Sequence, residues 1–161
     1  MDAEELRNQI EQYIRDKGIR FSHHLHRPGD PLGLYRQSKH KDGSGKITFT
    51  IFVYRKNHCD QIDDHLIEAF TIAHEFGHHQ SFLNKYRTQH YQSLIEEHYD
   101  RWKLFNSDQK QMIMDEEKRA WSYARQILEH FGFSDWSALD QHKNESLSIY
   151  RKMLSMTEEI N

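Results

Sequence analysis

The sequence of 161 residues predicts one α+β domain, in which an N-terminal helix and a small antiparallel sheet precede a mostly helical C-terminal part. Residues 47–54 are rich in β-branched and aromatic side chains, apolar residues after position 62 recur at helical spacing, and no repeat or linker divides the chain. We therefore expect the first helix and the sheet in residues 1–61, the central helices in residues 62–130, and a C-terminal helical region in residues 131–161.

The first 61 residues are expected to form one helix and three strands. Asp2 and the apolar face that follows it predict a helix that ends at Gly18. Alternating apolar side chains predict a strand over residues 19–25, a short strand over residues 34–38 and the strongest strand over residues 47–54. Turn-forming residues separate the three segments, so we expect the strands to pair antiparallel.

The chain after these strands is expected to be helical. Residues 62–86 contain no proline and carry two aspartates near their start, which favour a helix N-terminus. A shared apolar face predicts helical structure over residues 91–105, and a helix over residues 109–130 is expected to end at Gly132. Ser134 is expected to cap a last amphipathic region.

Composition gives no sign of several classes of protein. The net charge is −3 with acids and bases interspersed, so we expect no nucleic-acid binding. No apolar run reaches the length of a membrane span, and the first residues lack the basic and apolar parts of a signal peptide. The single cysteine, Cys59, leaves no internal disulfide and fits a reducing compartment. We therefore expect a cytoplasmic protein with no membrane partner.

A five-residue string carries the strongest functional signal. His74 and His78 are four residues apart, so on a helix both imidazoles project from one face and can bind one cation. Glu75 can then take a proton from a water on that cation, as in the zinc-peptidase pattern His-Glu-x-x-His. The alternative is a pair of core histidines bonded to neighbouring groups. The apolar stripe beside them and the presence of Glu75 favour the metal site.

A catalytic zinc takes three protein ligands and leaves a fourth position open. A metzincin would have a glycine and a histidine where this chain has Ser81 and Asn84, so that class is excluded. A deformylase would use a cysteine, but Cys59 lacks the flanking glycine and leucine of that family and is less favoured. A glutamate from a downstream helix is the remaining class of third ligand.

Glu117 is the favoured glutamate. It lies in the middle of an apolar stripe on the helix over residues 109–130, whereas Glu116 and Asp115 are expected to point more toward water. A carboxylate on a buried stripe needs a cation or strong donors, which a zinc ion on the histidine pair would supply. A buried Arg or Lys partner for this carboxylate is the alternative. The other candidate ligands are Glu116, Glu96 and Glu97.

Two segments resemble those of the ImmA/IrrE-type metallopeptidases. The active-site helix of that family is close to Phe-Thr-Leu-Ala followed by His-Glu-x-x-His, and residues 70–78 here are Phe-Thr-Ile-Ala-His-Glu-Phe-Gly-His. The glutamate segment of the family is Glu-x-x-Ala-Asn-x-Phe-Ala, and residues 117–124 are Glu-Lys-Arg-Ala-Trp-Ser-Tyr-Ala. The resemblance covers residues 1 to about 130. It departs at Trp121, which replaces the asparagine, and at residues 127–130, which lack the proline of the family.

This resemblance implies a gluzincin-like, minimal zincin fold and an intracellular zinc-dependent endopeptidase. His74, His78 and Glu117 would hold Zn²⁺, and Glu75 would be the general base in the hydrolysis of a peptide bond. The implied substrates are proteins or peptides, transcriptional repressors among them. The alternative is a non-catalytic zinc-binding interaction or sensor protein, a pseudo-peptidase that regulates a partner. Glu75 argues against it, because a structural site needs no general base.

Three further expectations concern the surroundings of the site. The strand over residues 47–54 is either an edge for an extended substrate or an ordinary sheet strand. His23, His24 and His26 are expected to be surface histidines, because no acid or cysteine stands nearby to complete a second metal site. A tetrahedral oxyanion needs a side-chain donor, and the sequence leaves five candidates open: His79, Tyr86, His90, Tyr91 and His98.

Overall fold

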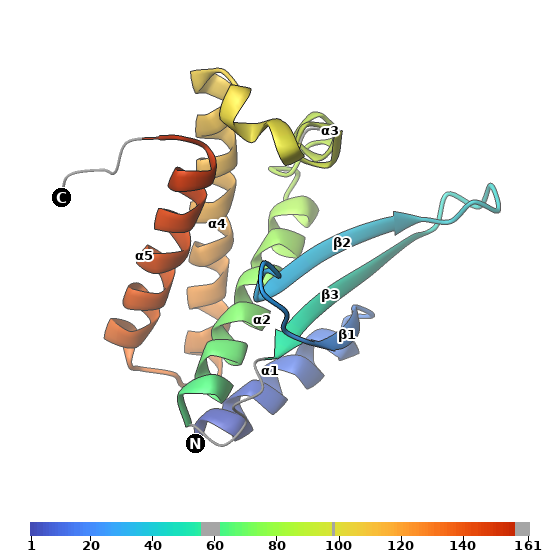
Figure 1. Ribbon diagram of the computed structural model, residues 1–161. Helices are drawn as coiled ribbons and strands as arrows, with labels where there is room; N and C mark the ends of the chain where they lie inside the picture. Colours follow the sequence, from blue (N-terminus) through green and yellow to red (C-terminus); the bar gives the residue numbers. More distant parts are fainter. Residues whose placement is uncertain (56–61, 98, 157–161) are drawn as a thin grey trace.

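Figure 1 shows the computed structural model, which describes residues 1–55, 62–97 and 99–156. The α+β class is confirmed, because one helix and three strands precede a mostly helical remainder. The elements are, in chain order, α1 (Ala3–Asp16), β1 (Arg20–Leu25), β2 (Gly33–Lys39), β3 (Ile47–Arg55), α2 (Ile62–Leu83), α3 (Gln89–Glu97), the 3₁₀ helix η1 (Tyr99–Leu104), α4 (Ser107–His130) and α5 (Trp136–Met153).

The three strands form a mixed sheet in the order β1-β3-β2. β2 pairs antiparallel with β3, with Tyr35 opposite Ile51, as expected. β1 pairs parallel with β3, with Phe21 opposite Ile51, so the expectation of a fully antiparallel sheet is wrong. Turn residues predict where the chain reverses, and both reversals are present. They do not predict which strands become neighbours, and here β3 inserts between β1 and β2.

The central position of β3 also settles which strand edges are open. Residues 50–53 of β3 are paired on both sides, so over that stretch the strand is an ordinary sheet strand, one of the two alternatives for residues 47–54. Residues 47–49 are paired with β2 alone. In the part of the chain that the structure describes, the long unpaired edges belong to β1 and β2.

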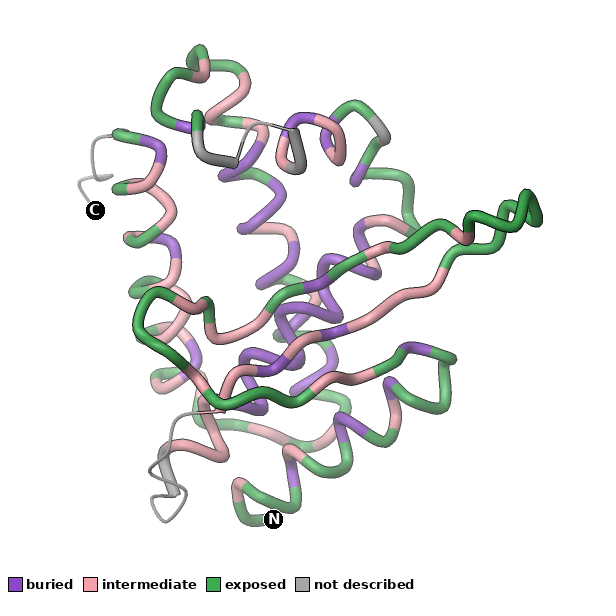
Figure 2. Tube along the Cα trace, turned by 45° about the vertical axis from the view of Figure 1, so that its right-hand side comes forward, coloured by how far each residue is buried: buried purple, intermediate pink, exposed green. Residues whose placement is uncertain are grey.

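α2 is the central element of the fold. One side of it packs on β2 and β3, α1 lies beside it, and α4 packs along another side with α5 beyond (Figure 1). Figure 2 shows that buried residues run along α2 and along the facing sides of α1 and α4. The largest fully buried side chains come from α1, the sheet, α2 and α4, and include Ile10, Ile14, Ile51, Phe70, Ile72, Ile113 and Leu128.

The helix ends follow local capping chemistry. α4 begins at a capping box in which Asn106 and Gln109 exchange side-chain to backbone bonds. The cap of α5 is Asp135, which accepts from the Ala138 amide, and not Ser134 as expected. The expected helical segment over residues 91–105 is divided between α3 and η1. Among the described helices, none combines the length and the apolar character needed to cross a membrane.

Candidate metal centre

α2 and α4 cross at two small residues. A methyl group on Gly77 would overlap the backbone carbonyl of Ala120, so the two helices approach this closely only because position 77 has no side chain. His74 and His78 flank Gly77 along α2, and Glu117 lies one turn before Ala120 on α4. The crossing therefore brings two imidazoles and one carboxylate together.

The carboxylate of Glu117 faces both histidines. Its Oε2 lies 3.1 Å from His74 Nε2, and its Oε1 lies 3.4 Å from His78 Nε2. The two imidazole centroids are 4.7 Å apart. All three side chains are buried, with exposed fractions of 5% for each histidine residue and 3% for Glu117. The structure thus brings together the three residues that the sequence singles out as metal ligands.

Two atoms at the centre have no hydrogen-bond partner. His74 Nε2 and Glu117 Oε2 are both fully buried and unsatisfied, although they face each other. Buried polar atoms without partners cost about 1–3 kcal/mol each. A divalent cation held between two imidazole nitrogens and a carboxylate oxygen would satisfy both atoms, and this donor set suits zinc. The residues present therefore fit a metal ion.

Glu116 holds the second histidine from behind. Its Oε1 lies 3.1 Å from His78 Nδ1, and its Oε2 accepts from Ser81 Oγ at 2.7 Å and from Arg119 at 2.9 Å. Burial alone would raise the pKa of Glu116, but the contacts with His78, Ser81 and Arg87 lower it, so the group is a carboxylate. A carboxylate only accepts, so Nδ1 of His78 carries the proton and Nε2 is free to bind a metal.

The position of Glu116 corrects the sequence-based expectation. Glu116 was expected to point more toward water, yet its exposed fraction is 2%, while Asp115 is exposed as expected. The buried stripe of α4 is wider than the spacing of its apolar residues indicates, because polar groups from α2 complete it. Glu116 contacts His78 through Nδ1 and Glu117 faces Nε2, so Glu116 is placed to orient the His78 ring and Glu117 remains the favoured third ligand.

Trp121 holds the first histidine in a different way. Its ring stacks on His74 with centroids 4.3 Å apart and an angle of 18° between the planes. This is the position at which the ImmA/IrrE-type motif has an asparagine. In this chain a flat aromatic contact, and not a side-chain amide, restricts the rotation of the His74 ring.

Glu75 lies on the side of the centre nearest the sheet. Its Oε1 is 3.5 Å from His74 Nδ1, and a methyl group on Gly33 at the start of β2 would lie 2.9 Å from the same oxygen. Donor atoms of His74, Glu75 and His78 all lie within 4.8 Å of one another. Burial would raise the pKa of Glu75, but the two histidines and Arg87 lower it. Glu75 is therefore an ionised carboxylate and can accept a proton.

The electrostatics of the centre favour a positive charge. Burial would lower the pKa of His74, but the adjacent carboxylates of Glu117 and Glu75 raise it to about 9. The same two carboxylates that attract a proton to this imidazole would attract a metal cation. Protons and metal ions therefore compete for the same nitrogen.

The structure describes four of the five candidate oxyanion donors, which differ in burial and in contacts. His79 is buried among aromatic rings on the sheet side of α2, bonded through Nδ1 to the Tyr35 hydroxyl at 3.0 Å, and burial lowers its pKa to about 4. Tyr86 and His90 are exposed, with Arg119 over the Tyr86 ring. Tyr91 is buried, and burial followed by the charge of Glu117 raises its pKa. His98 lies outside the described residues.

Tyr150 is a half-buried residue of α5 that the sequence does not single out, and its hydroxyl is under the influence of the carboxylates of the centre. It lies on the inward face of α5, between the buried Leu147 and Leu154, and its ring stacks on Trp102 with centroids 6.0 Å apart. Burial and the carboxylates of Glu117 and Glu75 raise the pKa of its hydroxyl well above the usual value, so it stays protonated. In the sequence, Tyr150 is one aromatic residue on the apolar face of the last helix, and nothing in that pattern points to the centre.

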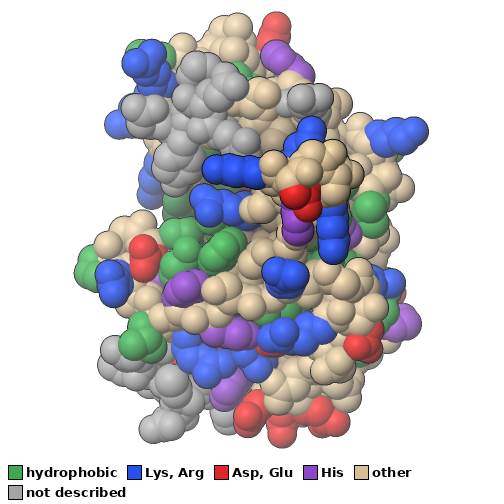
Figure 3. All heavy atoms as spheres, turned by 90° about the vertical axis from the view of Figure 1, so that its right-hand side faces the viewer, with side chains coloured by type: hydrophobic (Ala, Val, Ile, Leu, Met, Phe, Trp, Pro, Cys, Tyr) green, Lys and Arg blue, Asp and Glu red, His purple; other side chains and the backbone are tan. Residues whose placement is uncertain are grey.

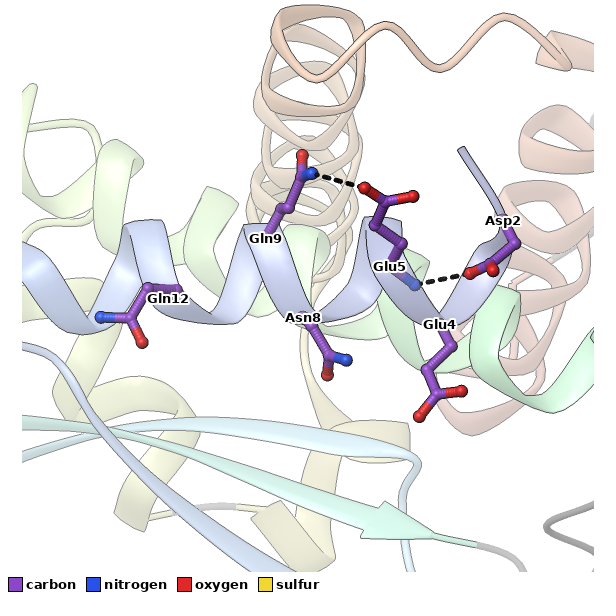
Figure 4. Close-up of a pocket in the computed structure, with 6 residues that line it drawn as sticks. All are labelled: Asp2, Glu4, Glu5, Asn8, Gln9 and Gln12. Atoms are coloured by element: carbon purple, nitrogen blue, oxygen red, sulfur yellow. Dashed lines mark hydrogen bonds between the residues drawn. The ribbon is translucent and has the colours of Figure 1, made fainter.

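The remaining candidates either lie outside the described residues or are bonded elsewhere. Cys59 and the side chains of Glu96 and Glu97 lie outside the part that the structure describes. The three histidines near β1 have separate partners: His23 bonds Glu11, His24 bonds Ser22, and His26 bonds the Asp30 carbonyl. The hollow in Figure 4 lies on exposed polar residues of α1 alone, including Glu4 and Gln12, and not on α2 or α4.

Comparison with known proteins identifies no family for this chain. No protein-family profile, no curated protein and no solved structure matches the chain.

Proposed function

We propose that this protein is a zinc-dependent metalloendopeptidase that hydrolyses peptide bonds. The observation that carries the proposal is the position of Glu117, whose two carboxylate oxygens face the Nε2 atoms of His74 and His78 across the Gly77–Ala120 crossing. Two imidazoles and one carboxylate are a catalytic zinc set with one open position. Glu75 beside that set supplies the general base that a structural zinc site does not need.

Zinc, when bound, would polarise the peptide carbonyl and make a water acidic near neutral pH. The protein groups do the rest. Glu75, held ionised by its neighbours, takes the proton from the attacking water and passes it to the leaving amine. His78 keeps its orientation through Glu116, and His74 keeps its orientation through the Trp121 stack. These contacts hold the ligands in one geometry before substrate arrives.

We propose Tyr150 as the donor to the oxyanion. Burial and the carboxylates of Glu117 and Glu75 raise the pKa of its hydroxyl, which therefore keeps the proton that it would donate. Tyr91 interacts instead with Glu117, Arg87 and Glu116, on the side of the positioning carboxylate. His79 is bonded through Nδ1 to the Tyr35 hydroxyl and packed among aromatic rings, so it is not proposed as a donor.

The open edge of β2 is the proposed binding place for an extended substrate. Gly33, at the beginning of that strand, touches the Glu75 carboxylate, so a peptide paired with β2 would run beside the general base. The resemblance of the two motifs to ImmA/IrrE-type metallopeptidases supports a regulatory protein, such as a transcriptional repressor, as the substrate. It also supports a cytoplasmic site of action.

The test is the Glu75→Gln substitution in the zinc-loaded protein. We expect this variant to bind zinc as the wild type does and to lose cleavage of casein and of a fluorescence-quenched peptide library. Glu129→Gln, the same change at an exposed position of α4, is the matched control and should leave both properties unchanged. Undiminished turnover in Glu75→Gln would remove Glu75 from the mechanism. Zinc binding without any cleavage by the wild type would instead favour the sensor protein.

A further inference from the structure

The outer face of the sheet is open to solvent. In the described structure the helices pack on the other face, against Tyr35, Ile51 and Val53, which are buried. The alternate residues point outward, as the strand registers require. Leu34 on this face is 39% exposed, and His24 and Arg36 are also exposed. An uncovered sheet face with large apolar and aromatic side chains is a candidate interaction surface.

Four planar side chains form a row across this face. Arg36 on β2 lies over the Phe52 ring at 5.7 Å, and His24 on β1 stacks on Phe52 at 5.8 Å and on Tyr54 at 5.4 Å. The stacked rings come from β1 and the central strand β3, and the guanidinium comes from β2. We call this row the aromatic face. Aromatic rings and an arginine on an open sheet are the groups on which unpaired nucleobases stack.

Charge on this part of the molecule is positive. Residues 17–55 contain eight Lys or Arg and two Asp or Glu, whereas the rest of the chain contains 14 and 23. Arg20 and Arg36 lie on the aromatic face, and no acidic side chain occupies an outward position of the three strands. Figure 3 shows Lys, Arg and His side chains gathered on this side, with apolar side chains between them. The overall charge of −3 averages over the two regions and hides this asymmetry.

We infer that the aromatic face binds single-stranded nucleic acid, with bases stacked on Phe52, His24 and Tyr54 and phosphates near Arg20 and Arg36. This binding is independent of the proposed peptidase activity, because none of these residues belongs to the metal centre. An acidic protein would complement the charge equally well. It would not need the stacked planar groups, which favour bases as the contacting chemistry.

The experiment is fluorescence anisotropy with labelled dT20 and U20 oligonucleotides at about 50 mM salt, where electrostatic contacts are strong. We expect micromolar binding that weakens as salt rises, and weaker binding of a duplex, whose base faces are covered. Phe52→Leu keeps the apolar contact with the sheet and removes the stacking ring, so it should weaken binding roughly tenfold. Arg36→Gln should weaken binding and lower the salt slope by about one.

Arg101→Gln, the loss of an exposed arginine on η1, is the control and should leave binding unchanged. Thermal melts of each variant show that it is folded. The proposal would be overturned if Phe52→Leu bound dT20 and U20 as tightly as the wild type. It would also be overturned if the wild type bound heparin as tightly as the oligonucleotides, because both results would show only attraction to a polyanion. Absence of oligonucleotide binding by the wild type would overturn the proposal too. So would a wild-type dimer that Arg36→Gln dissociates, because a second copy of the chain would then cover this face.

Discussion

Glu116 and Glu117 are adjacent in the sequence but contact different atoms of the histidine pair. Glu117 faces the two Nε2 atoms, and Glu116 faces Nδ1 of His78 together with Ser81 and Arg119. A helix turns about 100° per residue, so two neighbouring carboxylates can reach the metal-facing and the rear side of one imidazole. The proposed metal ligand and the residue proposed to orient His78 therefore come from one turn of α4.

The rear contact predicts a measurable effect on metal affinity. Glu116→Ala removes the acceptor that keeps the proton on His78 Nδ1, so zinc binding should weaken about 10- to 100-fold. A chelator competition with the purified protein measures it. Asp115→Ala, an exposed neighbour on the same helix, should bind zinc as the wild type does. Equal zinc affinity in Glu116→Ala and Asp115→Ala would show that the Glu116 contact is only structural.

Spacing along α2 and α4 singled out the three side chains that the structure brings together, because their periodicity is local. His74, His78 and Glu117 follow from the i, i+4 pair and from the middle of an apolar stripe. The depth of Glu116 could not be predicted, because two of its partners, His78 and Ser81, come from α2. Tyr150 could not be predicted either, since α5 is brought to the centre only by the packing of the whole chain.

At the scale of helices, the Gly77–Ala120 crossing sets the geometry of the centre. Gly77→Ala would place a methyl group against the Ala120 carbonyl and force α2 and α4 apart. Overpacking of this kind costs about 1–3 kcal/mol in the free energy of unfolding. We expect a lower melting temperature and a loss of zinc affinity in the same variant, measured by calorimetry and by metal titration.

Ser122→Ala is the matched control for the crowding that Gly77→Ala introduces. Ser122→Ala adds no bulk and lies on the exposed side of α4, so it should leave both the melting temperature and the zinc affinity unchanged. If Gly77→Ala bound zinc as tightly as the wild type, the centre would tolerate a wider crossing and the role given to Gly77 would be wrong.

The pairing of the strands is the part of the fold that the sequence predicted least well. Apolar alternation located all three strands, yet β1 lies parallel to β3. Neighbour choice depends on how the sheet meets α1 and α2, and no short stretch of sequence encodes that packing. The parallel pairing places β3 in the centre and leaves β2 as the edge beside Glu75.

At the scale of the whole molecule, one carboxylate links the first helix to the sheet. Glu11 on α1 bonds His23 on β1 and pairs with Arg15 and Arg7. Burial would raise the pKa of Glu11, but these contacts lower it to about 2. A carboxyl whose pKa is lowered in the folded state stabilises the fold above its unfolded pKa, and this contribution is lost as pH falls toward 2.

The acid sensitivity of folding therefore depends on Glu11. Melting temperatures of the wild type should fall on acidification from pH 4.5, the ordinary pKa of a glutamate, to about pH 2. Glu11→Gln should start from a lower melting temperature near neutral pH and fall less over the same range. Parallel slopes for the two proteins would show that Glu11 does not contribute to the acid sensitivity.

The most direct test of the metal centre is the zinc content of the purified wild type and of Glu117→Ala, measured by elemental analysis. Glu117→Gln is the second variant, because it keeps the size of the side chain. A thermal melt of each protein shows whether it is folded. We expect one zinc per wild-type chain and a loss of zinc in both folded variants. Full zinc occupancy with unchanged affinity in folded Glu117→Ala would contradict the assignment of His74, His78 and Glu117 as the ligand set.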